Sequence, residues 1–290
     1  MARLKVALIQ LDAGPDPEAN IREAVRLADL AAADGARLVA LPEYLQYRGS
    51  DDGYRASARP IPGPFSDAFV QVARERGVWI LAGSLAESGP AGRPYNTSVL
   101  IAPDGEIAAT YRKIHLFDVA LFDGPADRES ERVTAGDRAV VAELEGTRIG
   151  LSICYDLRFP ELYRALAGAG AEILAVPANF LEQTGRDHWE VLLRARAIEN
   201  GAYVIAPAQV GSPAGVQAHG RSMVVDPWGT VVAQAADEVT IILAELDLAR
   251  VASIRGQIPV LANRRPAAVA SVEERQATPV SGLTRGGAAK

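Results

Sequence analysis

The chain has 290 residues, a net charge of −6 and a hydrophobic fraction of 49%, which is an ordinary globular composition. Its single cysteine excludes an internal disulfide and a cysteine-based zinc site, and it favours a reducing compartment, the cytoplasm. The acidic balance argues against a nucleic-acid partner. We expect no membrane span, because no apolar stretch approaches roughly 20 residues, and no signal peptide, because the start at Met1 lacks an apolar core.

The first part of the chain alternates predicted strands and helices. Short apolar runs predict strands at 4–11, 37–41 and 78–81. Helical spacing of apolar residues predicts helices over 17–34 and 66–76, the second capped by Ser66. This β-α-β-α-β order is typical of an α/β fold.

The remaining elements are a hairpin, an irregular segment and a second strand–helix series. The turn Pro103-Asp104-Gly105 predicts a hairpin of strands 96–102 and 106–111, and 118–138 shows no clear period. Further strands are predicted at 148–153, 173–176, 203–207, 223–225, 230–234 and 240–246, with helices at 160–167 and 188–200. Without a dividing linker, we expect one domain over 1–270 and a polar tail, 271–290, that is mobile or wraps a partner subunit.

Three chemically active side chains follow predicted strands. Glu43 follows 37–41, Lys113 follows 106–111, and Cys154 follows 148–153 just before a helix. Carboxyl ends of strands are where α/β sheets place their sites, and a sharp strand-to-helix turn exposes a nucleophile. Taken singly, each has a plain alternative: a solvated glutamate, a surface cation and a small buried hydrophobe.

Together the three side chains form an acyl-transfer set without histidine. A thiol needs a base before it attacks, and a glutamate can take that proton. A lysine ammonium can stabilise the thiolate and the oxyanion that follows. The residues are therefore sufficient for acyl transfer, with Glu43 able to act as the base, Lys113 as the cation and Cys154 as the nucleophile.

The blocks around these residues resemble those of the nitrilase (carbon–nitrogen hydrolase) superfamily. They are Leu41-Pro42-Glu43, Tyr111-Arg112-Lys113 and Cys154-Tyr155-Asp156-Leu157-Arg158-Phe159-Pro160-Glu161. The resemblance implies a four-layer α-β-β-α sandwich, a Glu-Lys-Cys triad and a homodimer or larger homo-oligomer. It also implies a second glutamate between lysine and cysteine that orients the substrate nitrogen or relays a proton. Glu129 matches it better than Glu131.

Further blocks resemble the branch that contains ω-amidase and deaminated-glutathione amidase. They are Lys113-Ile114-His115-Leu116-Phe117-Asp118, Thr184-Gly185-Arg186-Asp187-His188-Trp189-Glu190, Asp226-Pro227-Trp228-Gly229 and Ile254-Arg255-Gly256-Gln257-Ile258-Pro259-Val260. The resemblance implies hydrolysis of the terminal amide of a small carboxylic acid to the acid and ammonia, through a thioester, with no cofactor. N-carbamoyl amino acid hydrolysis is the alternative, followed by nitrile hydrolysis or a catalytically retired scaffold.

Substrate contacts are predicted from sheet position and from nearness to Cys154. Asn179 and Phe180 follow the strand 173–176 and should line the pocket, and the backbone N–H of Tyr155 should face the oxyanion. Arg158 could bind a substrate carboxylate or pair with Glu161 or Asp156.

The other singled-out side chains are predicted to be structural. The three histidines, His115, His188 and His219, have no metal-like spacing, so we predict no metal site, and a structural or supporting hydrogen-bonding role for His188. Trp189 and Trp228 are expected in a core or an interface.

Overall fold

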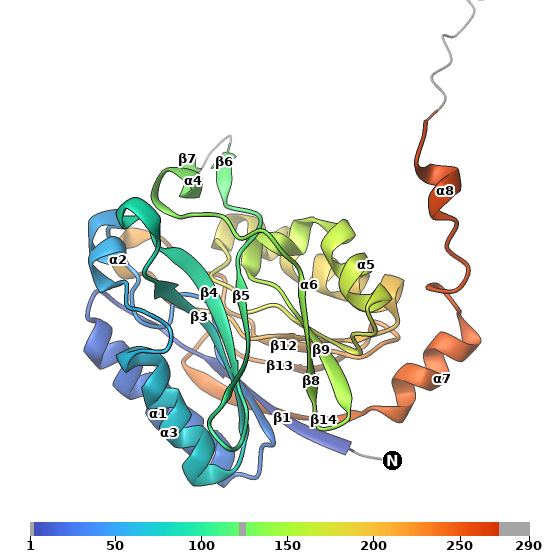
Figure 1. The fold of residues 1–290 in the computed structure, drawn as a ribbon, viewed down its shortest axis with the longest axis horizontal. Helices are drawn as coiled ribbons and strands as arrows, with labels where there is room; N and C mark the ends of the chain where they lie inside the picture. The colour runs from blue at the N-terminus through green and yellow to red at the C-terminus, as the bar shows by residue number, and fades with distance from the viewer. Residues whose placement is uncertain (1–2, 122–125, 273–290) are drawn as a thin grey trace, which may run out of the picture.

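Two six-stranded β-sheets stack face to face between two layers of helices (Figure 1). The structure, a computed structural model, describes residues 3–121 and 126–272. The strand orders are β14-β1-β2-β3-β4-β5 and β13-β12-β11-β10-β9-β8. This arrangement confirms the α-β-β-α sandwich that the sequence predicts.

The first sheet combines a parallel centre with antiparallel edges. Strands β1, β2 and β3 run parallel, β14 is antiparallel to β1, and β4 and β5 continue from β3 as an antiparallel meander. Strand β5 therefore runs in the same direction as β2, and both end at the same edge of the sheet. The strands are β1 (Arg3–Gln10), β2 (Leu38–Ala40), β3 (Trp79–Glu87), β4 (Tyr95–Ile101), β5 (Ile107–Arg112) and β14 (Thr240–Asp247).

The second sheet has the same plan. Strands β9, β10 and β11 are parallel, and β8, β12 and β13 extend the sheet with antiparallel pairs. The strands are β8 (Val140–Leu144), β9 (Thr147–Leu151), β10 (Ile173–Ala175), β11 (Tyr203–Ala206), β12 (Met223–Val225) and β13 (Val231–Gln234). A separate two-stranded ribbon pairs β6 (Asp118–Ala120) with β7 (Ala126–Arg128).

Four helices form the outer layers: α1 and α3 against the first sheet, and α5 and α6 against the second (Figure 1). Each presents one apolar stripe, as in α1, where Ala24, Leu27, Ala28 and Ala31 are buried at helical spacing. The helices are α1 (Pro17–Ala33), α2 (Asp51–Ser57), α3 (Pro64–Arg76), α4 (Glu129–Arg132), α5 (Pro160–Gly168), α6 (Glu182–Asn200), α7 (Ala249–Gln257) and α8 (Pro266–Val269), with 3₁₀ turns η1 (Pro90–Gly92), η2 (Cys154–Arg158) and η3 (Pro213–Gly215).

The largest apolar cluster includes side chains from both sheets, among them Leu8 and Leu81 of the first and Leu151 and Leu174 of the second. Burial of these side chains, at roughly 1.5–3 kcal/mol each, holds the sheets against each other. The packing fixes the carboxyl ends of strands from both sheets relative to one another, which is what the site requires.

Two predicted helix starts were wrong. Helix α3 begins at Pro64 after Gly63, and Ser66 lies one turn inside, where its Oγ accepts from Gly63 N–H at 2.9 Å and donates to Gly63 O at 2.9 Å. Helix α6 begins at Glu182. In the sequence, Gly185 makes the first turn of α6 resemble a loop, because glycine is about 1 kcal/mol less favourable than alanine inside a helix. His219 occupies the space that a Cβ at this position would need.

The segment 118–138 was predicted to be irregular, but its described residues contain β6, β7 and α4. The sequence also missed β8, which pairs with β9 across the tight turn Glu145-Gly146, where both residues have positive φ. Helices α2, α7 and α8 were missed as well. These elements are short, so the periodic pattern that reveals a longer helix is absent.

The carboxy-terminal prediction falls mostly outside the described residues, since 273–290 lie beyond them. Helix α7 contributes buried Val251 and Ile254, whereas Val269 of α8 is 78% exposed. Figure 1 shows α8 standing away from the two sheets. Of the two tryptophans expected in a core or an interface, Trp189 is fully buried, and Trp228 is half exposed.

Candidate active site

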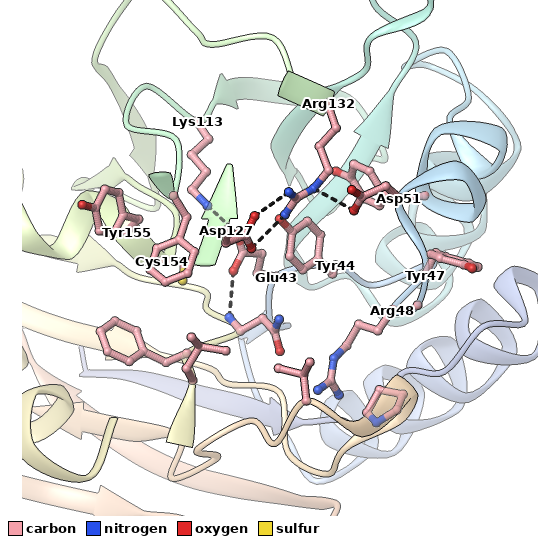
Figure 2. A pocket seen from close by; sticks show the side chains of 18 of the residues that line it. Glu43, Tyr44, Tyr47, Arg48, Asp51, Lys113, Asp127, Arg132, Cys154 and Tyr155 are labelled. Atoms are coloured by element: carbon pink, nitrogen blue, oxygen red, sulfur yellow. Dashed lines mark hydrogen bonds and ion pairs between the residues drawn. The ribbon is translucent and has the colours of Figure 1, made fainter. Parts of the chain in front are cut away.

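The three predicted catalytic side chains come together at the carboxyl ends of their strands. Glu43 follows β2, Lys113 follows β5, and Cys154 opens the turn η2 after β9. Figure 2 shows Glu43 between Lys113 and Cys154. All are buried, with exposed fractions of 1% for Glu43 and Lys113 and 7% for Cys154.

Cys154 lies on a strained elbow. Its φ of +48° is unusual for a residue with a side chain, and its backbone N–H is held by Pro177 O at 2.9 Å. Tyr44, directly after Glu43, also has a positive φ, +59°. Such backbone strain of about 1–3 kcal/mol persists only where the surroundings enforce it, and it clusters at functional sites.

Glu43 is fixed through both carboxylate oxygens. Oε1 accepts from Lys113 Nζ at 3.0 Å and from Asn96 Nδ2 at 2.9 Å, while Oε2 accepts from the backbone N–H of Asn179 at 2.8 Å. Glu43 and Cys154 line the same cavity, and the Glu43 carboxylate is near enough for its charge to act on the pKa of the Cys154 thiol. This placement suits Glu43 to the role of general base for the thiol.

Glu129 lies behind Lys113 and is fully buried. Its carboxylate accepts from Lys113 Nζ at 2.9 and 3.2 Å, from Tyr44 Oη at 2.9 Å and from Phe117 N–H at 2.6 Å. Glu131, the other candidate, is exposed and its nearest partner is Arg128 at 3.9 Å. Lys113 is thus held between two buried carboxylates, Glu43 and Glu129.

Burial and the neighbouring charges together set the pKa values of Lys113 and Glu129. Burial alone would lower the pKa of Lys113, but the charges of Glu129 and Glu43 outweigh it and raise that pKa well above its ordinary value. Burial likewise opposes ionisation of Glu129, yet Lys113 and the hydrogen bonds to it lower the pKa of Glu129. Glu129 is therefore ionised and Lys113 protonated at neutral pH.

The surroundings that favour the charged forms of Lys113 and Glu129 favour the neutral form of the Cys154 thiol. Burial, followed by the negative charge of Glu43, raises the pKa of Cys154 well above its ordinary value, although Lys113 acts to lower it. The resting side chain of Cys154 is therefore a neutral thiol. Its proton must leave as the sulfur attacks.

A cavity of about 360 Å³ opens onto the cluster (Figure 2). Among the predicted residues, Glu43, Lys113, Cys154, Tyr155, Asn179 and Phe180 line it. Asn179 Oδ1 is buried and has no hydrogen-bond partner in the described part of the chain. A buried acceptor of this kind is suited to a donor on a bound molecule.

Two predicted residues lie outside that lining. Glu129 is shielded by Lys113. Arg158 lies over the rings of Phe180 and Tyr155, at 5.1 and 5.9 Å from their centroids, and its Nη1 contacts His188 Nδ1 at 3.2 Å. Its predicted pairing with Glu161 or Asp156 is not among the ion pairs of the described residues.

Sequence reasoning missed three supporting residues. Asn96 of β4 donates to Glu43, and no signal marks it in the sequence, because the polar residues Thr97 and Ser98 follow it directly. His115 and Asp156 pair at 2.7 Å, and Asp156 also accepts from Tyr111 Oη at 2.6 Å. Because His115 follows Lys113 closely and Asp156 follows Cys154, this pair ties the lysine segment to the nucleophile turn.

A glycine makes room for the loop that carries Glu43. A Cβ on Gly83 would lie 1.8 Å from Leu41 O and 2.6 Å from Pro42 O. The backbone of β3 and the segment before Glu43 therefore approach more closely than any side chain permits.

Within residues 3–121 and 126–272, no group of histidine, cysteine, aspartate and glutamate side chains is arranged to hold a metal ion. Over the same residues, no helix combines the length and apolar character needed to cross a bilayer. His219 pairs with Glu182 at 2.8 Å and His188 with Arg158 at 3.2 Å, so each of these histidines has a hydrogen-bonding partner.

A four-layer sandwich with glutamate, lysine and cysteine at its strand ends defines a class of cysteine hydrolases that act on carbon–nitrogen bonds. Residues 5–256 match the carbon–nitrogen hydrolase family, and the chain belongs to this family. It is therefore an amide-hydrolysing enzyme.

Similar proteins agree with this assignment. The chain is 44% identical to a deaminated glutathione amidase of Synechocystis over 89% of its length and 97% of the relative. It is 39% identical to omega-amidase NIT2-A of Xenopus laevis, over 91% of this chain and 96% of the relative. The crystal structure of the C. elegans NitFhit protein superposes with a TM-score of 0.86 and 37% identity, over 92% of this chain and 67% of that one.

Proposed function

We propose that this enzyme hydrolyses the terminal amide of a small carboxylic acid, such as deaminated glutathione or α-ketoglutaramate, to the acid and ammonia. The observation that carries the proposal is that Glu43, hydrogen bonded to Lys113 at 3.0 Å, lines the same cavity as Cys154. The amidases named among the similar proteins support the substrate class.

Acylation begins when Glu43 takes the thiol proton as the sulfur of Cys154 bonds to the amide carbon. Negative charge moves to the carbonyl oxygen, where Lys113 Nζ and the backbone N–H of Tyr155 stabilise it. One such donor is typically worth a factor of about 10²–10³ in rate. The carbon–nitrogen bond then breaks, Glu43 returns the proton to the nitrogen, and ammonia leaves a thioester on Cys154.

Deacylation repeats the sequence with water. Glu43 takes a proton from the water as its oxygen attacks the thioester carbon. The carbon–sulfur bond then breaks, the sulfur regains a proton from Glu43, and the acid departs. Because Glu43 is held on both oxygens, it can act first as base and then as acid within each half-reaction without moving.

The neighbouring residues have supporting roles in this scheme. Glu129 does not line the cavity, so its contacts favour positioning Lys113 and keeping it charged over touching the substrate nitrogen. Asn179 Oδ1 offers an acceptor for the amide NH₂, and Phe180 contributes an apolar wall. Arg158, which lies over the rings of Phe180 and Tyr155, stays a candidate for binding the substrate carboxylate.

The test is ammonia release from α-ketoglutaramate, succinamate, deaminated glutathione, an N-carbamoyl amino acid and a simple nitrile. We expect the amides to react, and the faster of α-ketoglutaramate and deaminated glutathione identifies the branch. Cys154→Ala should reduce turnover to background while the melting temperature is retained. Normal turnover in that variant refutes the mechanism. Preference for the carbamoyl compound would replace the amidase proposal by the alternative.

Location, assembly and domain extent belong to the same proposal. A lone nucleophilic thiol is suited to the reducing cytoplasm, and we propose a homodimer or larger homo-oligomer with one hydrolase domain over 1–270. Cell fractionation and sedimentation of the full chain test the location and the assembly.

A further inference from the structure

Two arginines line the cavity besides Lys113: Arg48 and Arg132. Arg48 lies on the loop after Glu43, and Arg132 lies at the end of α4. A buried guanidinium beside a substrate is the group best suited to bind a carboxylate, because its planar fork matches the two oxygens. The question is which of the two has donors free for that task.

Arg132 is fully occupied by carboxylates of the protein. Its Nη atoms donate to Asp127 at 2.5 and 3.1 Å, and its Nε contacts Asp51 at 3.2 Å. Figure 2 shows the guanidinium between these two aspartates. With two negative partners for one positive charge, this side chain has no positive charge to offer an anionic ligand.

Arg48 is in a different state. Its side chain is only 5% exposed, and its one acidic partner, Asp12, is 44% exposed and 3.2 Å away. Its other acceptors are neutral: Val210 O at 2.8 Å, with Gln209 Oε1 and Gly211 O each at 3.4 Å. Burial lowers the pKa of Arg48 to about 10, so the surroundings compensate its charge poorly.

The donors of Arg48 are unevenly used. Nη1 serves Asp12, Gln209 and Val210, whereas the Nε–Nη2 edge makes only the long contact with Gly211 among the described residues. Arg112 uses the same edge to bind the carboxylate of Glu87, donating from Nε at 2.8 Å and from Nη2 at 2.6 Å. Arg48 therefore retains the bidentate edge that arginine uses for carboxylates.

The placement of Arg48 suits the far end of a short substrate. Figure 2 shows it on the opposite side of Glu43 from Cys154. Gln209 links the two sides, since its Oε1 accepts from Arg48 and its Nε2 donates to Glu43 O at 2.8 Å. A molecule whose amide lies at Cys154 thus extends along the cavity wall toward Arg48.

We propose that Arg48 binds the free carboxylate of the substrate and thereby selects amides that carry one. This inference rests on the proposed amidase function and adds the residue that selects the acid. It assigns to Arg48 the role that the sequence suggested for Arg158.

The test compares succinamate with butyramide, which has similar length and no carboxylate. We expect wild-type enzyme to favour succinamate in kcat/KM. Arg48→Gln should lower the succinamate-to-butyramide ratio by on the order of 10- to 100-fold, the usual effect of losing a hydrogen bond to a charged group. Arg48→Lys should keep an intermediate ratio, because it retains the charge and loses the fork.

The ratio separates binding from folding, because a general loss of structure lowers both activities together. Arg138→Gln is the matched control, because Arg138 is exposed, pairs with Asp137 and lies outside the cavity lining, so its ratio should stay near that of the wild type. An unchanged ratio in Arg48→Gln, or a collapse in Arg158→Gln alone, overturns the assignment. Wild-type enzyme that cleaves both amides without preferring succinamate overturns it as well. Wild-type enzyme that cleaves no amide refutes the proposed function instead.

A second readout does not depend on turnover. Succinate, which carries the same carboxylate, should inhibit butyramide hydrolysis by the wild type, and Arg48→Gln should raise its inhibition constant by a similar factor. Equal inhibition of both enzymes by succinate would contradict the proposal.

Discussion

Replacing Lys113 by methionine removes the only positive charge that contacts both Glu43 and Glu129 within the described residues. Methionine has a similar length and fits the same buried space, so packing changes little. What changes is the charge balance, since two buried carboxylates lose their common partner. The variant therefore isolates the electrostatic contribution of Lys113.

The expected cost is large because the group is buried. Removing one partner of a buried ion pair typically costs about 3–5 kcal/mol. With a shift of roughly 2–4 °C per kcal/mol for a domain of this size, the melting temperature should fall by about 6–20 °C at neutral pH. Turnover should be lost as well, because Lys113 stabilises the oxyanion in the proposed mechanism.

The stability difference between the wild type and Lys113→Met should depend on pH, and the direction of that dependence follows from the pKa of Glu129. In the wild type, the lowered pKa of Glu129 contributes stability above the ordinary glutamate value, and it is lost as pH falls through the folded-state pKa. Without Lys113, burial raises that pKa, so stability is greatest below the ordinary value and is lost as pH rises. The difference between the two proteins should therefore widen from about pH 4.5 to pH 8.

The assay is thermal unfolding at several pH values, with ammonia release in parallel. Lys5→Met is the matched control, since its Nζ reaches only the carbonyl of Asp34 and its loss should cost less than about 1 kcal/mol. Adding Glu129→Gln to Lys113→Met should restore at least half of the lost stability. Equal costs for the two lysines, or no rescue by the second substitution, would refute the reasoning.

Two further predictions concern the thiol and the close backbone contact. The ultraviolet absorbance of the Cys154 thiolate should be absent at about pH 8.5, where an ordinary thiol is half ionised. In Glu43→Gln this absorbance should develop at a lower pH than in the wild type, because the Glu43 charge raises the thiol pKa. A wild-type thiol that is half ionised at that pH contradicts this prediction. Gly83→Ala should destabilise the protein in urea unfolding by about 3 kcal/mol or more, because its Cβ would lie 1.8 Å from Leu41 O. Gly14→Ala, with open space around its Cβ, should change stability by less than about 1 kcal/mol, and equal effects would argue against this account.

The proposed catalytic residues could be picked out from the sequence because their signals are local: Glu43, Lys113 and Cys154 each follow a predicted strand. Strand periodicity likewise reveals β1 and the hairpin β4–β5. Glu43 and Lys113 follow strands of the first sheet and Cys154 follows a strand of the second, so only the packing of the two sheets brings Cys154 to the other two.

The supporting residues could not be found in this way. Asn96 is one of three consecutive polar residues in β4, and only the register of β4 beside β5 brings it to Glu43. The contact of Glu129 with Lys113 depends on how the segment after β7 folds over the site. Helix α6 begins six residues earlier than predicted because packing outweighs the low helix propensity of Gly185.

Arg48 illustrates the difference most clearly. By sequence it is one arginine among many, in a polar stretch after Glu43. The segment Gln209–Gly211, far along the chain, folds against it and buries it with a single half-exposed acid as its charged partner. The sequence alone determined which chemistry is present, because nucleophile, base and cation are properties of residue types. Only the tertiary structure decided which charges are left uncompensated, because burial and partners arise from segments that meet in space.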